Sequence, residues 1–486
     1  MNRRTFIHAT GAASVGLTGG LAFAGSDAQV ATLLALLEDS SRDRVPRELV
    51  RQIRAGARYE DVLGALCLAT VRNVQPYPDV GFKYHSFMML RSIHSTTQHL
   101  PAADRWIPLI WAADYFKDTQ AQERASGGWR QSAKAVALGG DAETARRALV
   151  AALDRWDRDA ADEAIVKYAQ AAPVDAVFSV LFPYGARDLR AIGHKAITVS
   201  NAHELTLILG RQHAAPLLRS TVAALLNSDA DANPASHDLV PDRPWRRSSE
   251  LLARIPPSWK DGRDDRGARA ELRTALYQTS PEDIGNGVVE FLRRGISADA
   301  IWQVLFATAA ELVLRQPGIV SLHAQTTANA LHYAYGASND EPTRQLTLLQ
   351  CSAFVCLFRQ MTGASGTDLN LDTLEALEHR PGSDALAEMF SDLSAGHRLQ
   401  AARRCLGYLQ SGGDVQQLIA TARTHLVDGA EEAHDYKFSE AVFDSYSQFP
   451  LKAWQDRFLS AGMGYFKAPV RRPGSLVQQA RELLRA

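Results

Sequence analysis

Apolar side chains recur at helical spacing along nearly the whole chain, and this pattern constrains the fold more than any other feature. Segments such as 30–37 and 205–210 repeat apolar residues at the three- and four-residue spacing of one helix face. Alternating strand patterns bounded by hairpin turns are nearly absent. The sequence therefore predicts an all-α fold, and its 486 residues are too many for a single core.

A change in composition divides the chain. Between residues 229 and 268 the sequence becomes rich in Pro, Asp, Ser and Arg, which is typical of a connecting segment. We predict an N-terminal helical half at 27–228, a linker at 229–268 and a C-terminal helical half at 269–486. The two similar multi-helix halves are expected to pack closely around a central pocket.

Each half contains a similar motif, which indicates an internal repeat. The motif is a helix start with an acid in its first turn, an apolar run, a proline break and a helix with two histidines nine residues apart. The paired histidines are His85 with His94 and His323 with His332. Two looser copies lead to His194 and His434. His194 follows His85 by 109 residues, and His434 follows His323 by 111 residues.

Nine residues on a helix turn through about 900°, so the two histidines of a pair point to opposite faces. At most one of each pair can face a shared centre. The candidates are those near the start of each predicted helix, namely His85, His194, His323 and His434. Imidazoles on facing helices can bind iron, copper or zinc, or act as bases. A carboxylate-rich di-iron centre is disfavoured because the helices lack its glutamates and Glu-x-x-His pairs.

Lysines accompany three of these histidines. Lys83 precedes His85 by two residues, Lys195 directly follows His194, and Lys437 follows His434 by three. A lysine beside a metal is electrostatically unfavourable, whereas an ammonium group stabilises negative charge that develops on a substrate. We therefore predict that Lys195 and Lys437 stabilise charge while the four histidines act as bases or metal ligands.

The N-terminus has the features of an export signal. Residues 1–24 contain a charged start, a short apolar run and an A-x-A cleavage site. The pair Arg3 and Arg4, followed by Phe6, resembles the twin-arginine signal, whose translocase exports folded proteins. We expect a periplasmic or secreted protein that is free of the membrane after cleavage, because no other run is long enough to span one.

Charge and motif content narrow the function classes. The 53 basic and 54 acidic residues nearly cancel, which predicts small-molecule rather than nucleic-acid partners. The sequence lacks G-x-G-x-x-G, P-loop, G-x-S-x-G and H-E-x-x-H motifs, so nucleotide-dependent enzymes, α/β-hydrolases and zincins are disfavoured. No C-x-x-C-H motif for attached haem is present. The cofactor stays unidentified, with iron or copper as candidates.

Three short motifs resemble those of the questin oxidase-like family. They begin at His194 (HKAI), His323 (HAQTTANAL) and His434 (HDYKFSEA), and the resemblance spans roughly residues 56–446. His85 matches less closely. The resemblance implies oxygen-dependent, Baeyer–Villiger-type ring opening of polyketide quinones without an evident flavin-binding sequence. The export signal departs from that family, whose NADPH-using cytoplasmic reaction does not transfer simply to the periplasm.

These observations favour an exported oxidoreductase that acts on a small aromatic or carbonyl compound. Two alternatives stay open. One is a lyase or hydrolase that uses a metal on the same histidines. The other is a non-catalytic helical-repeat protein, in which the four histidines would lie far apart on separate repeats.

Overall fold

The computed structural model of the chain describes residues 27–76, 82–132, 141–227, 232–362, 369–378, 384–449 and 452–485. Regular structure in these ranges is helical, apart from one isolated parallel bridge between Arg263 and Ile296. The predicted all-α fold is confirmed. No helix in these ranges is both long and apolar enough to cross a membrane. The predicted signal at 1–24 lies outside the described residues.

The helices follow one another in this order. The first eleven are α1 Asp27–Asp39, α2 Val45–Arg54, α3 Tyr59–Asn73, α4 His85–Met88, α5 Leu90–Gln98, α6 Ile107–Ala125, α7 Ala142–Asp154, α8 Arg158–Ala171, α9 Val174–Arg187, α10 His194–Leu209 and α11 Ala214–Leu225. The others are α12 Arg243–Leu251, α13 Arg266–Gln278, α14 Ile284–Arg293, α15 Ala298–Arg315, α16 Ile319–Ala337, α17 Glu341–Thr362, α18 Ala385–Ser394, α19 Arg398–Gln410, α20 Val415–Gly429, α21 Ala433–Tyr446, α22 Lys452–Ala461 and α23 Ser475–Arg485.

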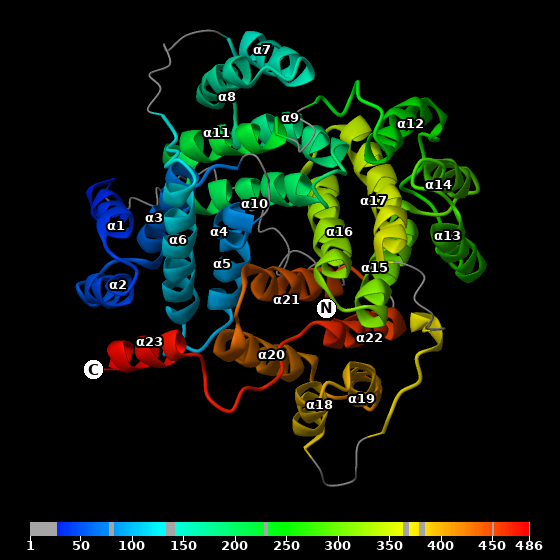
Figure 1. Cartoon of the computed structure of the whole chain (residues 1–486). Coiled ribbons are helices and arrows are strands. Elements are labelled where there is room, and N and C mark those ends of the chain that lie inside the picture. Colours follow the sequence, from blue (N-terminus) through cyan, green and yellow to red (C-terminus); the bar gives the residue numbers. More distant parts are fainter. Residues whose placement is uncertain are drawn as a thin grey trace, which may run out of the picture.

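A closed ring of helices forms the centre of the molecule (Figure 1). Helix α10 packs on α16, α16 packs on α21, and α21 packs on α4 and α5. Helices α4 and α5 in turn pack on α10, which closes the ring. Most residues of α10, α16 and α21 are buried on every side of the helix, as expected for helices surrounded by others. Polar side chains on these helices therefore meet one another inside the protein.

Buried and partly buried ion pairs tie the ring together. Arg91 on α5 binds Glu204 of α10, with 2.9 Å between Nε and Oε2, and also binds Asp444 of α21. Glu440 on α21 accepts two 2.9 Å hydrogen bonds from Arg423 of α20, and further bonds from two hydroxyl groups of α5. Removal of one partner from such a pair leaves an uncompensated buried charge. These contacts fix how α5, α10 and α21 lie against one another.

The two predicted halves share extensive contacts. Helix α10 from the first half lies against α16 from the second, and the final helix α23 lies against α2 and α6 (Figure 1). The predicted linker at 229–268 contains α12, which packs on α14 and α17. This segment is therefore a packed part of the fold where the structure describes it.

Gly193 sets the approach of α10 to α16. It has a left-handed backbone, with φ of +85°, immediately before the first residue of α10. A Cβ atom at this position would lie 1.9 Å from Oγ1 of Thr327 on α16. Only glycine satisfies both the backbone conformation and the close contact.

We predict that Gly193→Ala destabilises the protein by about 3 kcal/mol, because strain in the backbone adds to overpacking. The measurement is the free energy of unfolding in urea. The control is Gly287→Ala in the middle of α14, where no atom lies within 4 Å of the added Cβ. That change should be neutral or stabilise by about 0.5–1 kcal/mol. Equal effects of the two substitutions would contradict the assignment.

Candidate functional site

Four histidines meet inside the ring of helices. His85 and His194 are the first residues of α4 and α10, His434 is the second of α21, and His323 is the fifth of α16. All four are buried, and one ring nitrogen from each lies within 4.8 Å of the others. The predicted convergence of these four residues near helix starts is confirmed.

The imidazole rings form a closed circuit. The ring centroids are 4.9 Å apart for His85 and His194, and 4.7 Å apart for His194 and His323. The circuit closes through His434, whose centroid lies 5.0 Å from that of His323 and 4.4 Å from that of His85. Neighbouring rings are arranged edge to face, and one nitrogen of each ring lies close to those of the others.

Hydrogen bonds on the outer side fix two of the rings. The Nδ1 atom of His323 lies 2.6 Å from the backbone carbonyl oxygen of Ile319, and Nδ1 of His434 lies 3.1 Å from Oε2 of Glu432. Both partners are acceptors, so each Nδ1 carries a hydrogen. In the neutral tautomer this leaves Nε2 with a lone pair. An outer Nδ1–H bond of this kind orients a histidine that ligates a metal through Nε2.

The nitrogen positions are close to those around a single metal ion. Zinc–imidazole bonds are about 2.0–2.1 Å long, which places two ligand nitrogens about 2.9 Å apart at a right angle and about 4.1 Å apart across the ion. The Nε2 atoms of His194 and His323 are 2.9 Å apart, within hydrogen-bond distance, and the four nitrogens lie within 4.8 Å of one another. The widest separation exceeds the distance of about 4.1 Å across an ion, so the rings would have to move inward slightly to bind one ion together. The site therefore offers four imidazole donors from four helices.

Burial keeps these histidines neutral. Desolvation lowers the pKa of His85, His194 and His323 well below the usual value, and the nearby Lys437 and the other histidines lower it further. The pKa of His434 is also lowered by burial, although its bond to Glu432 opposes the shift. Neutral imidazole is the form that binds a metal or accepts a proton.

Lys437 lies beside the cluster, one helical turn after His434 on α21. Its side chain is buried, and its Nζ has no hydrogen-bond partner among the described residues. Burial lowers its pKa to about 7, opposed by the charge of Glu432. A substantial fraction of this amine is therefore uncharged near neutral pH and keeps a lone pair.

Lys195 lies elsewhere, although it follows His194 directly. Its ammonium group binds the carboxylate of Asp188 and the backbone carbonyl oxygens of Leu225 and Asn227. Adjacent positions on a helix point in different directions, so the neighbour of a site residue need not share its site. The contacts give Lys195 a position in the packing of α10 on α11, and we omit it from the proposed site.

The later histidines of the repeat also lie outside the cluster, as the nine-residue spacing predicts. His94 contacts the hydroxyl of Tyr59. His203 lies between Asp175 and Tyr333, with 3.0 Å and 2.9 Å hydrogen bonds. His332 packs on aromatic rings of α15 and α16. Lys83 pairs with Glu123 at 2.9 Å.

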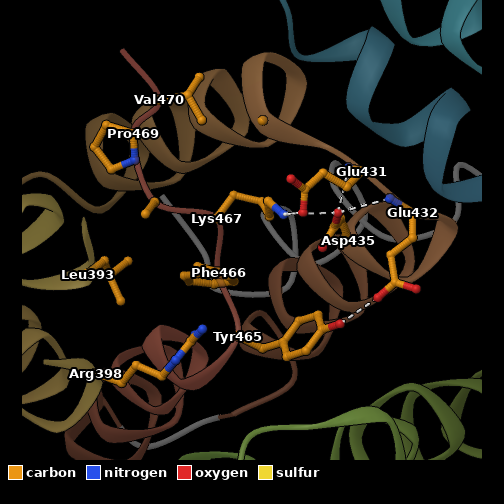
Figure 2. A pocket seen from close by; sticks show the side chains of 12 residues that line it. Leu393, Arg398, Glu431, Glu432, Asp435, Tyr465, Phe466, Lys467, Pro469 and Val470 are labelled. Carbon is orange, nitrogen blue, oxygen red and sulfur yellow. Dashed lines mark hydrogen bonds and ion pairs between the residues drawn. The ribbon is translucent and has the colours of Figure 1, made fainter. Parts of the chain in front are cut away.

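A surface pocket of about 510 Å³ lies next to the cluster, between the start of α21 and the segment 465–470 (Figure 2). Glu432 and Tyr465 form part of its wall. Neither residue was predicted from the sequence, because Glu432 lies just before α21 and Tyr465 belongs to a segment distant in the chain. The sequence signal that could have indicated Glu432 is its position two residues before His434.

Comparison with known proteins adds no identification: no protein family, curated protein or solved structure matches this chain. The site is therefore interpreted from its own geometry.

The lowered histidine pKa values predict a loss of stability in acid. Histidines of the unfolded chain gain a proton as the pH falls through about 6.5, while the buried four do not. Each such residue then lowers the free energy of unfolding by up to about 1.4 kcal/mol per pH unit. For metal-free protein unfolded in urea at pH 7.5, 6.5 and 5.5, His323→Gln should show a shallower loss than the wild type.

His397→Gln serves as the control, because His397 is exposed at the surface. This substitution should leave the pH dependence of the wild type unchanged. Parallel pH profiles for the wild type and His323→Gln would contradict the buried, neutral state of the cluster.

Proposed function

We propose that this protein is an oxidoreductase that binds one redox-active metal ion, iron or copper, on His85, His194, His323 and His434. The observation that carries the proposal is the closed circuit of four buried imidazoles with nitrogens within 4.8 Å of one another. Imidazole ligands suit iron, copper and zinc. No carboxylate belongs to this group among the described residues, which argues against a carboxylate-bridged di-iron centre.

The substrate class in this proposal is a small aromatic or carbonyl compound. The resemblance of the motifs at His194, His323 and His434 to the questin oxidase-like family supports it, together with the oxygen dependence that the resemblance implies. When bound, iron or copper would supply the one-electron chemistry that oxygen requires. The histidines would hold the ion, and Lys437 would stabilise negative charge on the substrate or donate its lone pair.

The proposal also includes export. We propose that residues 1–24 direct the folded protein to the twin-arginine translocase, and that the mature protein works in the periplasm or outside the cell. This route agrees with a metal ion that must be inserted before export. Near-equal numbers of basic and acidic residues support a small-molecule partner rather than nucleic acid.

A zinc-dependent lyase or hydrolase is the second candidate. The buried amine of Lys437, with its pKa of about 7, favours it because such a group can serve as a general base. Zinc content and turnover without oxygen would identify this class. The helical-repeat binding protein is less well supported, because the four histidines lie together rather than on separate repeats.

Metal analysis tests the proposal directly. Protein exported through its own signal should contain about one iron or copper ion per chain, measured by mass spectrometry of the elements. His323→Ala and His434→Ala should lose the ion, and oxygen uptake with a panel of quinones and phenols should fall at least about 100-fold. Both should keep the helical circular dichroism of the wild type.

His332→Ala is the matched control, since His332 lies on the same helix as His323 but packs on Trp302 and Phe306. It should retain the metal. Wild-type protein without a bound metal ion would refute the proposal. Collapse of the fold in His323→Ala and His434→Ala would instead favour a purely structural role for the histidines.

Lys437→Met separates two roles for the lysine. If its nitrogen stabilises charge on the substrate, the variant should keep its metal while oxygen uptake falls about 100-fold. If Lys437 belongs to the ligand set, metal content should fall as well. Removal of a buried amine without a hydrogen bond should not destabilise the fold, so the urea unfolding midpoint should equal or exceed that of the wild type. Full activity would exclude both roles.

A further inference from the structure

A chain of hydrogen bonds connects the histidine cluster to the surface pocket. Oε2 of Glu432 lies 3.1 Å from Nδ1 of His434, and the other oxygen of the same carboxylate accepts a 2.8 Å bond from the hydroxyl of Tyr465 (Figure 2). Glu432 and Tyr465 both line the pocket, whereas His434 reaches inward. One carboxylate therefore touches the cluster and the pocket wall together.

The backbone around Glu432 holds this link in place. Glu432 is the residue immediately before α21, and Asp435 accepts hydrogen bonds from the backbone N–H groups of Glu431 and Glu432 at 2.9 Å and 3.2 Å. Lys467 lies 3.3 Å from the carboxylates of both Glu431 and Asp435. The start of the helix that carries His434 is thus fixed independently of the His434 side chain.

His434 and His323 differ in the partner that holds the outer ring nitrogen. The outer nitrogen of His323 is held by the backbone carbonyl of Ile319 within its own helix, and Ile319 does not line the pocket. The outer nitrogen of His434 is held by a carboxylate whose side chain is 43% exposed. The hydrogen bonds to His434 and Tyr465 both lower the pKa of Glu432, so its charge is negative at neutral pH. A carboxylate in this position raises the basicity of the imidazole it holds.

We propose that Glu432 is a positioning residue for the metal centre and that Tyr465 orients it. Glu432 keeps His434 in the tautomer whose Nε2 faces the cluster and increases the electron density on that nitrogen. The inference depends on the proposed metal-binding function, so its test includes the wild-type affinity.

The test compares Glu432→Gln with Glu431→Gln in the full mature chain. Both substitutions remove one negative charge from the same pocket wall, but only Glu432 contacts His434. The affinity for Co²⁺ is measured by competition with a chelator, and the visible spectrum of the bound ion reports its coordination. Glu432→Gln should weaken Co²⁺ binding about 10- to 100-fold and alter the spectrum, the range found for outer partners of metal-bound histidines.

Glu431→Gln should stay within about 3-fold of the wild type. Tyr465→Phe keeps the carboxylate and should show a smaller loss than Glu432→Gln. The reduction potential of the copper-loaded protein should rise in Glu432→Gln, which a merely structural role would not produce. Equal affinities and spectra for the two glutamine variants, with the wild type binding metal, would overturn this inference alone. A wild type that binds no Co²⁺, iron or copper would overturn the proposed function and this inference with it.

Discussion

Burial of four imidazoles and one amine at a single point is the constraint on which the rest of the structure depends. Charged forms of these groups would be costly in the interior, and desolvation accordingly lowers their pKa values. The fold keeps the imidazoles neutral at physiological pH and leaves a substantial fraction of the Lys437 amine uncharged. A cluster of neutral nitrogen donors is stable without a counter-charge, yet it is also the form that binds a metal ion or accepts a proton.

Ion pairs lie outside this cluster. Arg91 of α5 pairs with Glu204 of α10 and Asp444 of α21, and Arg423 of α20 pairs with Glu440 of α21. Their pairing fixes these helices to one another around the cluster. The carboxylate of Glu432, in contrast, acts on His434 from the pocket side.

Much of this arrangement could be predicted. Helical spacing gave the fold class because apolar periodicity is a local property. The nine-residue histidine pairs and the spacings of 109 and 111 residues indicated a repeat, and the position near a predicted helix start selected the four histidines that converge. The prediction that Lys195 lies beside the cluster was wrong, because adjacent residues on a helix point their side chains in different directions. The ammonium of Lys195 instead donates hydrogen bonds to the carboxylate of Asp188 and to two backbone carbonyl groups.

The sequence by itself determined an all-helical chain, the helix starts near which the four histidines lie and the opposite faces of paired histidines, because these follow from local periodicity. Tertiary structure alone decided which lysine lies beside the cluster, which carboxylate holds His434 and where the pocket lies. Those features depend on contacts between segments such as α21 and Tyr465 that are brought together only by packing. The local sequence does not indicate which distant segments come into contact, so residue spacing could not predict these contacts.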